Sequence, residues 1–353
     1  MIRLFPLAFL FAASACAADG AVTPLPIDQQ IIADMRSAIA SGAYPQTTSI
    51  VVVDERGIAF EEYFNEGSRD TLNDTRSATK TLVAMAVGAA IEDGYIKSVD
   101  APILDYFADM APFANDAALK HEITVRDLLT MSSALDCDDN NDTPGNEENM
   151  YPLDDWKRFA LDLPIMKGWT RDASGLGPWR YCTAGSFLLG QTVERATGER
   201  IDRFVERRIL KPLGIEQAKW DLSPSGEIQT GGGLELTARD LAKLGAMMSD
   251  GGRLDGRQIL PREWVREMET VRRDAFGDMQ YGYQMWTRTY ASPCGGGQGW
   301  MMAGNGGNLV LSLPDRRAAL VISRTRYNTR GMHQETQELV EKYLLPALGC
   351  GNF

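Results

Sequence analysis

The stretch Ser77-Ala78-Thr79-Lys80 stands at the start of a long apolar run, Leu82-Val83-Ala84-Met85-Ala86-Val87-Gly88-Ala89-Ala90-Ile91. This run predicts a buried helix with Ser77 in its first turn and Lys80 one turn later on the same face. A serine hydroxyl is a poor nucleophile until a base takes its proton, and a neutral lysine amine can serve as that base. Free N–H groups at the start of the helix would favour an anion formed at the serine. Ser77 is the only serine in the chain with a lysine three residues further on.

The tetrapeptide by itself has a simpler interpretation, a capped amphipathic helix without catalysis. Other residues narrow the choice of chemistry. The chain has two histidines, His121 and His333, and no Gly-x-Ser-x-Gly sequence. An α/β-hydrolase with a nucleophile elbow and metal catalysis through several imidazoles are therefore disfavoured. A lysine or tyrosine base becomes the simpler choice, and we expect neither a metal nor another cofactor.

Length and charge limit the class of protein. The 353 residues suffice for one large domain or two interleaved ones, and the 44% hydrophobic content fits a globular protein. A net charge of -12 argues against binding to nucleic acid or to anionic membrane surfaces. No apolar run of about 18 residues follows the N-terminal region, so we expect no internal membrane span. The expected partner is a small-molecule ester or amide substrate.

The first residues resemble an export signal. Arg3 precedes the apolar run from Leu4 to Ala13, and small residues then offer an Ala-x-Ala cleavage site near residue 18. Periplasmic or secreted protein is the favoured prediction. The alternative is a lipoprotein anchored through Cys16, because Ala13-Ser-Ala-Cys16 loosely resembles a lipobox. Export would permit two disulfides among the four other cysteines, whereas buried thiols are the alternative: Cys137, Cys182, Cys294 and Cys350.

The order of predicted elements indicates an α+β fold. A helix at 28–40 precedes a hairpin, Ser49–Asp54 and Ile58–Phe64, with a turn at Glu55-Arg-Gly57. Residues 120–275 are mainly helical, with helices expected at Val125–Met131, Asp155–Leu161, Ala184–Ala196, Ile201–Leu210, Ala238–Met248 and Pro261–Met268. Strands return at Tyr283–Trp286, Gly299–Met302, Asn308–Ser312 and Ala318–Ser323, and a last helix lies near Gln334–Leu345. We therefore predict a sheet domain at 28–75 plus 280–350, interrupted by a helical domain at 76–279 that carries Ser77.

Five stretches in order resemble the serine β-lactamase and penicillin-binding-protein family. The resemblance is closest to its branch of class C β-lactamases, D-alanyl carboxypeptidases, esterases and 6-aminohexanoate-oligomer hydrolases. The stretches are Arg76–Leu82 with Ile91–Ile103, Ile123–Ser133, Trp179–Gly185, Gly231–Leu241 and Ala303–Asn308. The resemblance covers roughly residues 30 to 345. It implies an antiparallel sheet flanked by N- and C-terminal helices, with an inserted helical domain.

The resemblance also implies roles for residues that match the family's motifs. Ser77 would be the acyl-forming nucleophile, Lys80 would share its proton, and Tyr181 would relay the proton to the leaving group. A tyrosine near pKa 10 needs a nearby cation for this role, and Lys80 could supply it. The N–H groups of Ser77 and Asn308 would form the oxyanion hole.

Two motifs depart from the family pattern. The usual Tyr-x-Asn is Tyr181-Cys182-Thr183 here, so a carboxamide that could grip a substrate amide is replaced by a hydroxyl. The usual Lys or His that begins the third motif is Asn305, which removes a cation for a substrate carboxylate. By their positions in these two motifs, four residues are still expected to line a substrate site: Thr183, Asn305, Gly306 and Gly307. The two glycines would let the substrate approach closely.

The same resemblance guides the interpretation of the cysteines and of an acidic loop. Cys182 lies in the tyrosine motif and Cys137 follows a stretch that the family places beside the active site, so we predict Cys137–Cys182 and, with it, Cys294–Cys350. The acidic loop has EF-hand-like spacing at Asp136, Asp138, Asn140, Asp142 and Glu147. Its sixth position lacks glycine and helices do not clearly flank it, so a solvated acidic rim is favoured over calcium.

The sequence thus predicts a serine hydrolase that acts through an acyl-enzyme on a small ester or amide, with esterase-like specificity. The alternatives are β-lactamase or D-alanyl carboxypeptidase activity, and a non-catalytic binder or sensor that retains the pocket.

Overall fold

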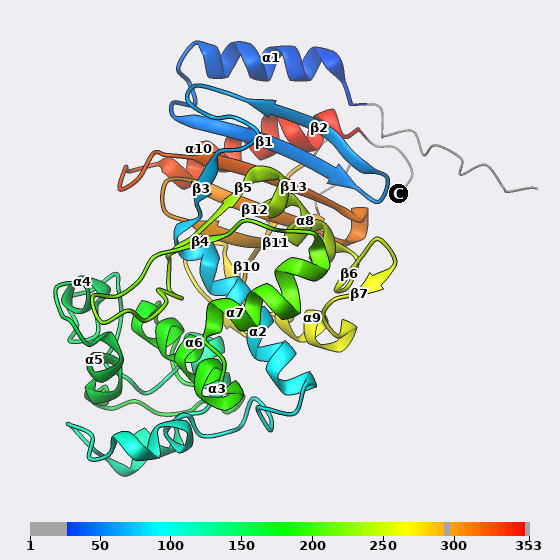
Figure 1. Ribbon diagram of the computed structural model, residues 1–353. Helices are drawn as coiled ribbons and strands as arrows, with labels where there is room; N and C mark the ends of the chain where they lie inside the picture. Colours follow the sequence, from blue (N-terminus) through cyan, green and yellow to red (C-terminus); the bar gives the residue numbers. More distant parts are fainter. Residues whose placement is uncertain (1–26, 293–296, 350–353) are drawn as a thin grey trace, which may run out of the picture.

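The structure is a computed structural model that describes residues 27–292 and 297–349. An eight-stranded antiparallel sheet dominates it, in the order β2-β1-β13-β12-β11-β10-β9-β8 (Figure 1). Its strands are β1 (Thr47–Asp54), β2 (Gly57–Tyr63), β8 (Arg273–Asp274), β9 (Gln280–Tyr281), β10 (Trp286–Tyr290), β11 (Gly297–Gly304), β12 (Asn308–Leu313) and β13 (Ala318–Arg324). The first and last parts of the chain therefore meet in one sheet, as β1 pairs with β13.

Side chains alternate between the two faces of the central strands, and each face packs into its own hydrophobic core. Ile50, Val52 and other residues of one face pack with α1 (Gln29–Ala40) and the C-terminal helices α10 (Met332–Leu339) and α11 (Leu345–Ala347). Val51, Val53 and their neighbours on the opposite face join a larger core with the internal helices. Asp28 begins α1 by accepting N–H bonds from Gln30 and Ile31, and its own N–H donates to the Ala347 carbonyl at 3.0 Å. Both faces of the central strands are thus buried.

The helical part lies beyond one end of the sheet (Figure 1). It contains α2 (Thr79–Glu92), α3 (Val125–Leu129), α4 (Glu147–Met150), α5 (Trp156–Asp162), α6 (Thr183–Thr197) and α7 (Ile201–Val205), while α9 (Arg262–Met268) flanks α2. Helix α2 is buried from Thr79 to Ala90. Gly88 allows the Trp264 indole to lie against α2, because a Cβ there would be 2.1 Å from the ring. The indole N–H donates to the Ala84 carbonyl at 3.0 Å, so this contact is both apolar and polar.

Helix α8 (Ala238–Ser249) falls within the predicted helical domain but packs on the sheet. Its Gly245 approaches β13 and β12 so closely that a Cβ would lie 2.7 Å from the Ala319 Cβ. The chain therefore returns to the sheet at α8, well before residue 280. Smaller sheets join β3 (Leu72–Asp74), β5 (Leu234–Thr237) and β4 (Lys219–Trp220), and β6 (Arg253–Leu254) with β7 (Arg257–Gln258).

One predicted strand is mostly wrong. Residues 283–285 of the predicted strand Tyr283–Trp286 are not in a strand, because Gln284 has a φ of 52° and bonds to helices instead of to a neighbouring strand; β10 begins at Trp286. Its N–H donates to the Leu129 carbonyl, and its carbonyl accepts from the Thr81 hydroxyl at 2.6 Å. The side-chain amide donates to the Leu128 carbonyl at 2.7 Å, so Gln284 ties α2 to α3. The predicted hairpin, the six internal helices and the other three strands are present within a few residues of their expected bounds.

In the part of the chain that the structure describes, no helix combines the length and apolarity needed to cross a membrane. The predicted signal segment and Cys16 fall outside the described residues.

Candidate active site

Ser77 and Lys80 meet as the sequence predicts. Ser77 lies in a 3₁₀ turn, Arg76–Ala78, that leads directly into α2, so it stands just before the α-helix instead of within its first turn. The Lys80 Nζ donates to the Ser77 Oγ at 3.0 Å and also to the Gly231 carbonyl. Lys80 is only 1% exposed. A buried amine in contact with a serine hydroxyl is suited to exchanging a proton with it.

The backbone before Ser77 adopts an uncommon conformation. Arg76 has a φ of 50°, in the left-handed region, and its N–H donates to the Asp74 carboxylate at 2.9 Å. The end of β11 abuts this turn at Gly304, where a Cβ would lie 2.1 Å from the Thr75 carbonyl oxygen. Gly304 is therefore required for β11 to approach the segment that carries Ser77. Such outliers persist where surrounding contacts impose them, and they are frequent at functional sites.

Tyr181 completes the predicted trio. It precedes α6, its ring centroid lies 5.1 Å from the Lys80 Nζ, and Trp286 stacks on it at 5.5 Å. Burial raises the pKa of the Tyr181 phenol, while the Lys80 charge and a hydrogen bond with Ser77 act in the opposite direction. The three side chains form one connected group in which a proton can pass between neighbours.

Aromatic rings line one side of this group. Trp179 lies edge-on to Trp286 at 5.5 Å and to Phe276 at 4.9 Å. Phe276 is 44% exposed, so the cluster runs from the partly buried Tyr181 to the surface. An aromatic surface beside the nucleophile favours substrates with an apolar part.

Thr183 lies in a different setting from the one predicted. It is fully buried at the start of α6, and a Cβ on Gly231 would be 2.5 Å from its methyl group. The Gly231 carbonyl in turn accepts from Lys80, and its N–H donates to the Gln229 side chain at 2.8 Å. Thr183 therefore packs behind the Lys80–Gly231 contact, and its expected place on the substrate-facing surface is corrected.

The residues of the third motif bond to and pack against the C-terminal segment, and their place in a substrate site stays a prediction. The Asn305 side chain donates to the Asn328 side chain at 2.6 Å and accepts from the Asn328 N–H at 2.8 Å. Gly306 and Gly307 have φ values of 91° and 85° and form the β11–β12 turn. A Cβ on Gly306 would meet the Tyr327 ring, and one on Gly307 would meet the Thr336 hydroxyl. These glycines are explained by the turn and by packing against the C-terminal segment.

Asn308 opens β12 opposite Gly304. Its side-chain amide donates to the carbonyls of Asp74 and Asn305, and its Oδ1 accepts from the Arg324 N–H at 3.1 Å. These bonds fix the connection between β11, β12 and the Ser77 turn. The role of the Asn308 N–H in an oxyanion hole stays a prediction.

Residues 136–147 are only in part the solvated rim that the spacing suggested: Asn140 and Asp142 are exposed, whereas Asp138 is buried. Asp138 is 7% exposed and accepts from the Asn140 N–H and from the Asn141 side chain, which makes it a turn-forming residue. Asp139 points towards the tyrosine motif and accepts from the Thr183 N–H at 2.7 Å. Within residues 27–292 and 297–349, no three His, Cys, Asp or Glu side chains are grouped as metal ligands. The loop is therefore built from internal hydrogen bonds.

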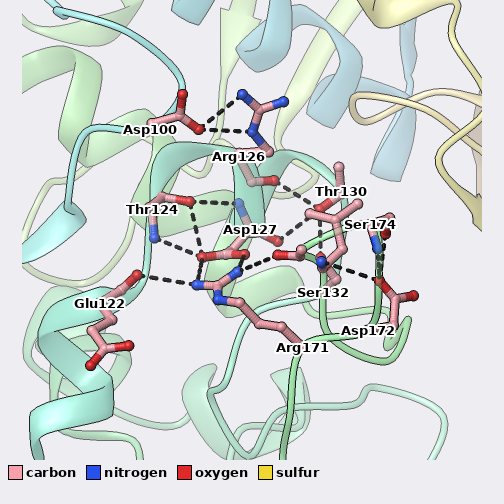
Figure 2. A network of polar contacts seen from close by, with 12 residues as sticks. Asp100, Glu122, Thr124, Arg126, Asp127, Thr130, Ser132, Arg171, Asp172 and Ser174 are labelled. Carbon is pink, nitrogen blue, oxygen red and sulfur yellow. Dashed lines mark hydrogen bonds and ion pairs between the residues drawn. The ribbon is translucent and has the colours of Figure 1, made fainter.

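A polar network surrounds the buried Asp127 at the start of α3 (Figure 2). Asp127 closes a capping box with Thr124 at the start of α3 and receives two bonds from Arg171, at 2.6 and 2.9 Å. Thr130 and Ser132 share a hydroxyl contact of 2.6 Å at the end of the same segment. Between them, the Met131 carbonyl accepts from the Arg180 N–H at 2.7 Å, so the network fixes the residue next to Tyr181.

The predicted pair Cys137 and Cys182 lies at disulfide distance, with sulfurs 1.99 Å apart and Cα atoms 5.4 Å apart. The pair joins the acidic loop to the residue after Tyr181. Cys294 and Cys350 fall outside the described residues, so their pairing stays a prediction.

Peptide mapping without reduction should recover Cys137 and Cys182 in one cross-linked peptide. Because 45 residues separate them, loss of the bond should lower the free energy of unfolding by about 3–5 kcal/mol in the chain-entropy model. Comparison of denaturant unfolding for the oxidised protein and for Cys137→Ala/Cys182→Ala measures this. Free thiols at both positions, or a different pairing, would refute the prediction.

Comparison with known proteins agrees with this geometry. The model of the family described as Beta-lactamase matches residues 31–344. The chain belongs to the Beta-lactamase family. The α+β fold expected from the sequence is thereby confirmed, including its sheet between N- and C-terminal helices and its helical insertion.

Within the Beta-lactamase family, the chain is similar to proteins with different named activities. It is 27% identical over 218 residues to the 6-aminohexanoate-dimer hydrolase of Paenarthrobacter ureafaciens, which covers 59% of this chain and 53% of that protein. It is 29% identical over 170 residues to the esterase EstB of Burkholderia gladioli, which covers 45% of this chain and 41% of that protein. The matches thus span about half the length of these relatives or less.

A solved structure of a penicillin-binding protein homologue from Pyrococcus abyssi shares the fold. It has a TM-score of 0.65 at 19% identity, over 88% of this chain and 76% of that one.

Three features of the site were not predicted from the sequence. Gly231 supplies a carbonyl to Lys80, Trp286 stacks on Tyr181, and Asp139 holds the tyrosine motif. The triple glycine at 231–233 was a detectable signal for the first of them. The Trp286 and Asp139 contacts join segments that are far apart in the sequence, so no local sequence pattern predicts them.

Proposed function

We propose that this chain is a serine hydrolase that acts through an acyl-enzyme on a small, uncharged ester or amide. One observation carries the proposal: the Lys80 amine lies 3.0 Å from the Ser77 hydroxyl and beneath the ring of Tyr181. In this arrangement Ser77 is the nucleophile, Lys80 the proton acceptor and Tyr181 the proton relay, and each lies next to another.

The reaction needs no further reactant than water. The Ser77 Oγ attacks the substrate carbonyl carbon while its proton passes to the neutral amine of Lys80 or to Tyr181. The tetrahedral oxyanion would be held by the N–H of Ser77 and a second N–H in the β11–β12 connection, for which Asn308 is the candidate. Collapse breaks the bond to the leaving alcohol or amine, which takes a proton from the Tyr181 hydroxyl, and a proton held by Lys80 then passes to Tyr181, so that both groups return to their starting states. Water then repeats the sequence on the acyl-Ser77 ester and releases the acid.

Charges around the site support a substrate without a carboxylate. Arg76, the cation next to Ser77 in the sequence, is paired with Asp74 at 2.8 Å and lies 4.4 Å from the Tyr327 ring centroid. The carboxylates of Asp139 and Glu147 act electrostatically on Tyr181. Asn305, which replaces the usual cation of the third motif, is engaged with Asn328. An anionic substrate would therefore meet these two carboxylates, and Arg76 already has a carboxylate partner.

The names of relatives agree with acyl transfer but differ in substrate, since one is an esterase and another hydrolyses an aminohexanoate dimer. The proposed location is outside the cytoplasm, either free or anchored through Cys16. The disulfide-distance pair supports an oxidising compartment.

We expect measurable hydrolysis of p-nitrophenyl acetate or butyrate and weak or absent hydrolysis of nitrocefin. A missing charge-assisted contact of about 1.5–3 kcal/mol lowers binding of an anionic substrate by about 10- to 100-fold, whereas a neutral ester loses nothing. Measuring kcat/KM for both substrates tests the specificity.

A higher kcat/KM for nitrocefin would contradict the assignment and favour β-lactamase activity. Arg76→Gln would then show whether this arginine leaves Asp74 to bind the carboxylate. Failure of the protein to turn over either substrate would favour the non-catalytic binder.

A further inference from the structure

Asp139 contacts the tyrosine motif at both of its ends. The Asp139 N–H donates to the Tyr181 carbonyl at 2.8 Å, and its carboxylate accepts from the Thr183 N–H at 2.7 Å. The residue between them, Cys182, lies at disulfide distance from Cys137, two positions before Asp139. Two residues of one loop thus hold three consecutive residues of another.

These contacts are made by a segment that has no regular secondary structure to fix it. Tyr181 lies in an irregular segment, and α6 begins only at Thr183. The Tyr181 ring stacks on Trp286, and the Arg180 N–H donates to the Met131 carbonyl on the N-terminal side of Tyr181. The bonds to Asp139 fix the two peptide groups on either side of Cys182, both of which follow Tyr181, and they thereby constrain the direction in which the phenol leaves the chain.

The Asp139 carboxylate is also part of the electrostatics of the site. Burial raises its pKa to about 6 and the charge of Glu147 adds to this effect, while Lys80 and the hydrogen bonds from Thr183 act against it. Tyr151 and Tyr181 also interact with it electrostatically. At pH 8 the carboxylate is ionised and faces the N-terminus of the 15-residue helix α6, where backbone N–H groups favour an anion.

We propose that Asp139 is a positioning residue for Tyr181: its ionised carboxylate on the Thr183 N–H and its own N–H on the Tyr181 carbonyl hold the phenol against Ser77 and Lys80. This role rests on the proposed serine hydrolase activity. Asp139 itself touches neither the nucleophile nor its base in this arrangement. Its loss should lower kcat and leave KM little changed.

The test compares Asp139→Asn, Asp139→Ala and the matched control Asp142→Asn, which removes a charge from an exposed position of the same loop. With p-nitrophenyl butyrate, we expect Asp139→Ala to lower kcat by about 10- to 100-fold, because small displacements of a catalytic group have effects of this size. KM should stay within about twofold, and Asp142→Asn should match the wild type.

The pH dependence separates positioning from general structural damage. Protonation of Asp139 makes the wild type resemble Asp139→Asn, so the ratio of their kcat values should reach its full value above pH 7 and fall several-fold by pH 5. A raised pKa means that the stabilisation present below the unfolded-state pKa is lost as pH rises through about 6. At pH 8 the Tm of Asp139→Asn should therefore be no lower than that of the wild type. A kcat ratio that is the same at pH 5 and pH 8, or a wild-type kcat in Asp139→Ala, would overturn the proposal.

Hydrogen exchange decides the same question without turnover. The Thr183 amide should exchange at least about tenfold faster in Asp139→Ala than in the wild type, because its acceptor is removed. If Asp139→Ala does not fold, Asp139→Asn at pH 8 serves for this measurement, with a smaller increase expected. Unchanged exchange at Thr183 contradicts the positioning role even in an inactive protein. A wild type without ester turnover but with this exchange pattern contradicts the proposed function alone.

Discussion

Ser77→Ala should lose ester hydrolysis by at least about 10⁴-fold in kcat/KM while the protein remains folded. The expected loss is large because the hydroxyl is the atom that forms the acyl bond, and neighbouring groups cannot take its place. The fold should tolerate the change. Lys80 keeps its bond to the Gly231 carbonyl, and Ala is compatible with the 3₁₀ turn that Ser77 occupies.

The measurement is steady-state hydrolysis of p-nitrophenyl butyrate together with thermal unfolding. Ser37→Ala, an exposed serine on α1, is the matched control and should retain wild-type turnover. Turnover by Ser77→Ala at the wild-type rate would refute the assignment of the nucleophile.

Lys80→Ala and Tyr181→Phe should each lower kcat by about 100-fold or more, because each removes a proton-transfer group from the trio. Their effects on stability should differ. Lys80 is buried, so its removal leaves the Gly231 carbonyl without that donor and opens a cavity. Tyr181→Phe keeps the ring that stacks on Trp286, so it tests the hydroxyl with little change in packing.

The kcat values of both variants are to be compared with that of Tyr343→Phe, a tyrosine of the C-terminal helical segment, which should keep the wild-type kcat, and Tm values are measured for all of them. A wild-type kcat in Tyr181→Phe would show that the phenol takes no part in proton transfer. The same result in Lys80→Ala would leave Ser77 without its proposed base.

The pairing of Ser77 with Lys80 could be predicted because it depends on local helical spacing. The pairing of Cys137 with Cys182 could be predicted because family resemblance places both segments beside one site. The hairpin at 47–63 and α6 follow from patterns that a few consecutive residues carry, which is why their bounds are close to those expected.

Other features depend on contacts that no short pattern contains. Gln284 breaks an apolar stretch of strand character because its backbone bonds to Leu129 and Thr81, which are distant in the sequence. Asn305 and Gly306 matched a motif by position, but the direction in which they face is set by Asn328 and Tyr327. A motif therefore locates a loop more reliably than it assigns the side chains that meet a substrate.

Asp139 is a residue of the site that the sequence did not single out. In the sequence it is one acid among several in a polar loop, and composition favours a solvated surface. The structure turns it inwards because Thr183 offers an unpaired N–H at the start of α6. Asp139 is thus turned inwards because the Cys137–Cys182 pair and the Thr183 N–H fix its loop there, and its residue type alone would not predict this.

The most direct test of the central claim is intact-mass measurement after exposure to a fluorophosphonate, followed by peptide mapping. We expect one covalent adduct per wild-type chain, located on Ser77, and no adduct on Ser77→Ala under the same conditions. An unmodified wild-type protein, or an adduct on another residue that persists in Ser77→Ala, would contradict the claim that Ser77 is an activated nucleophile.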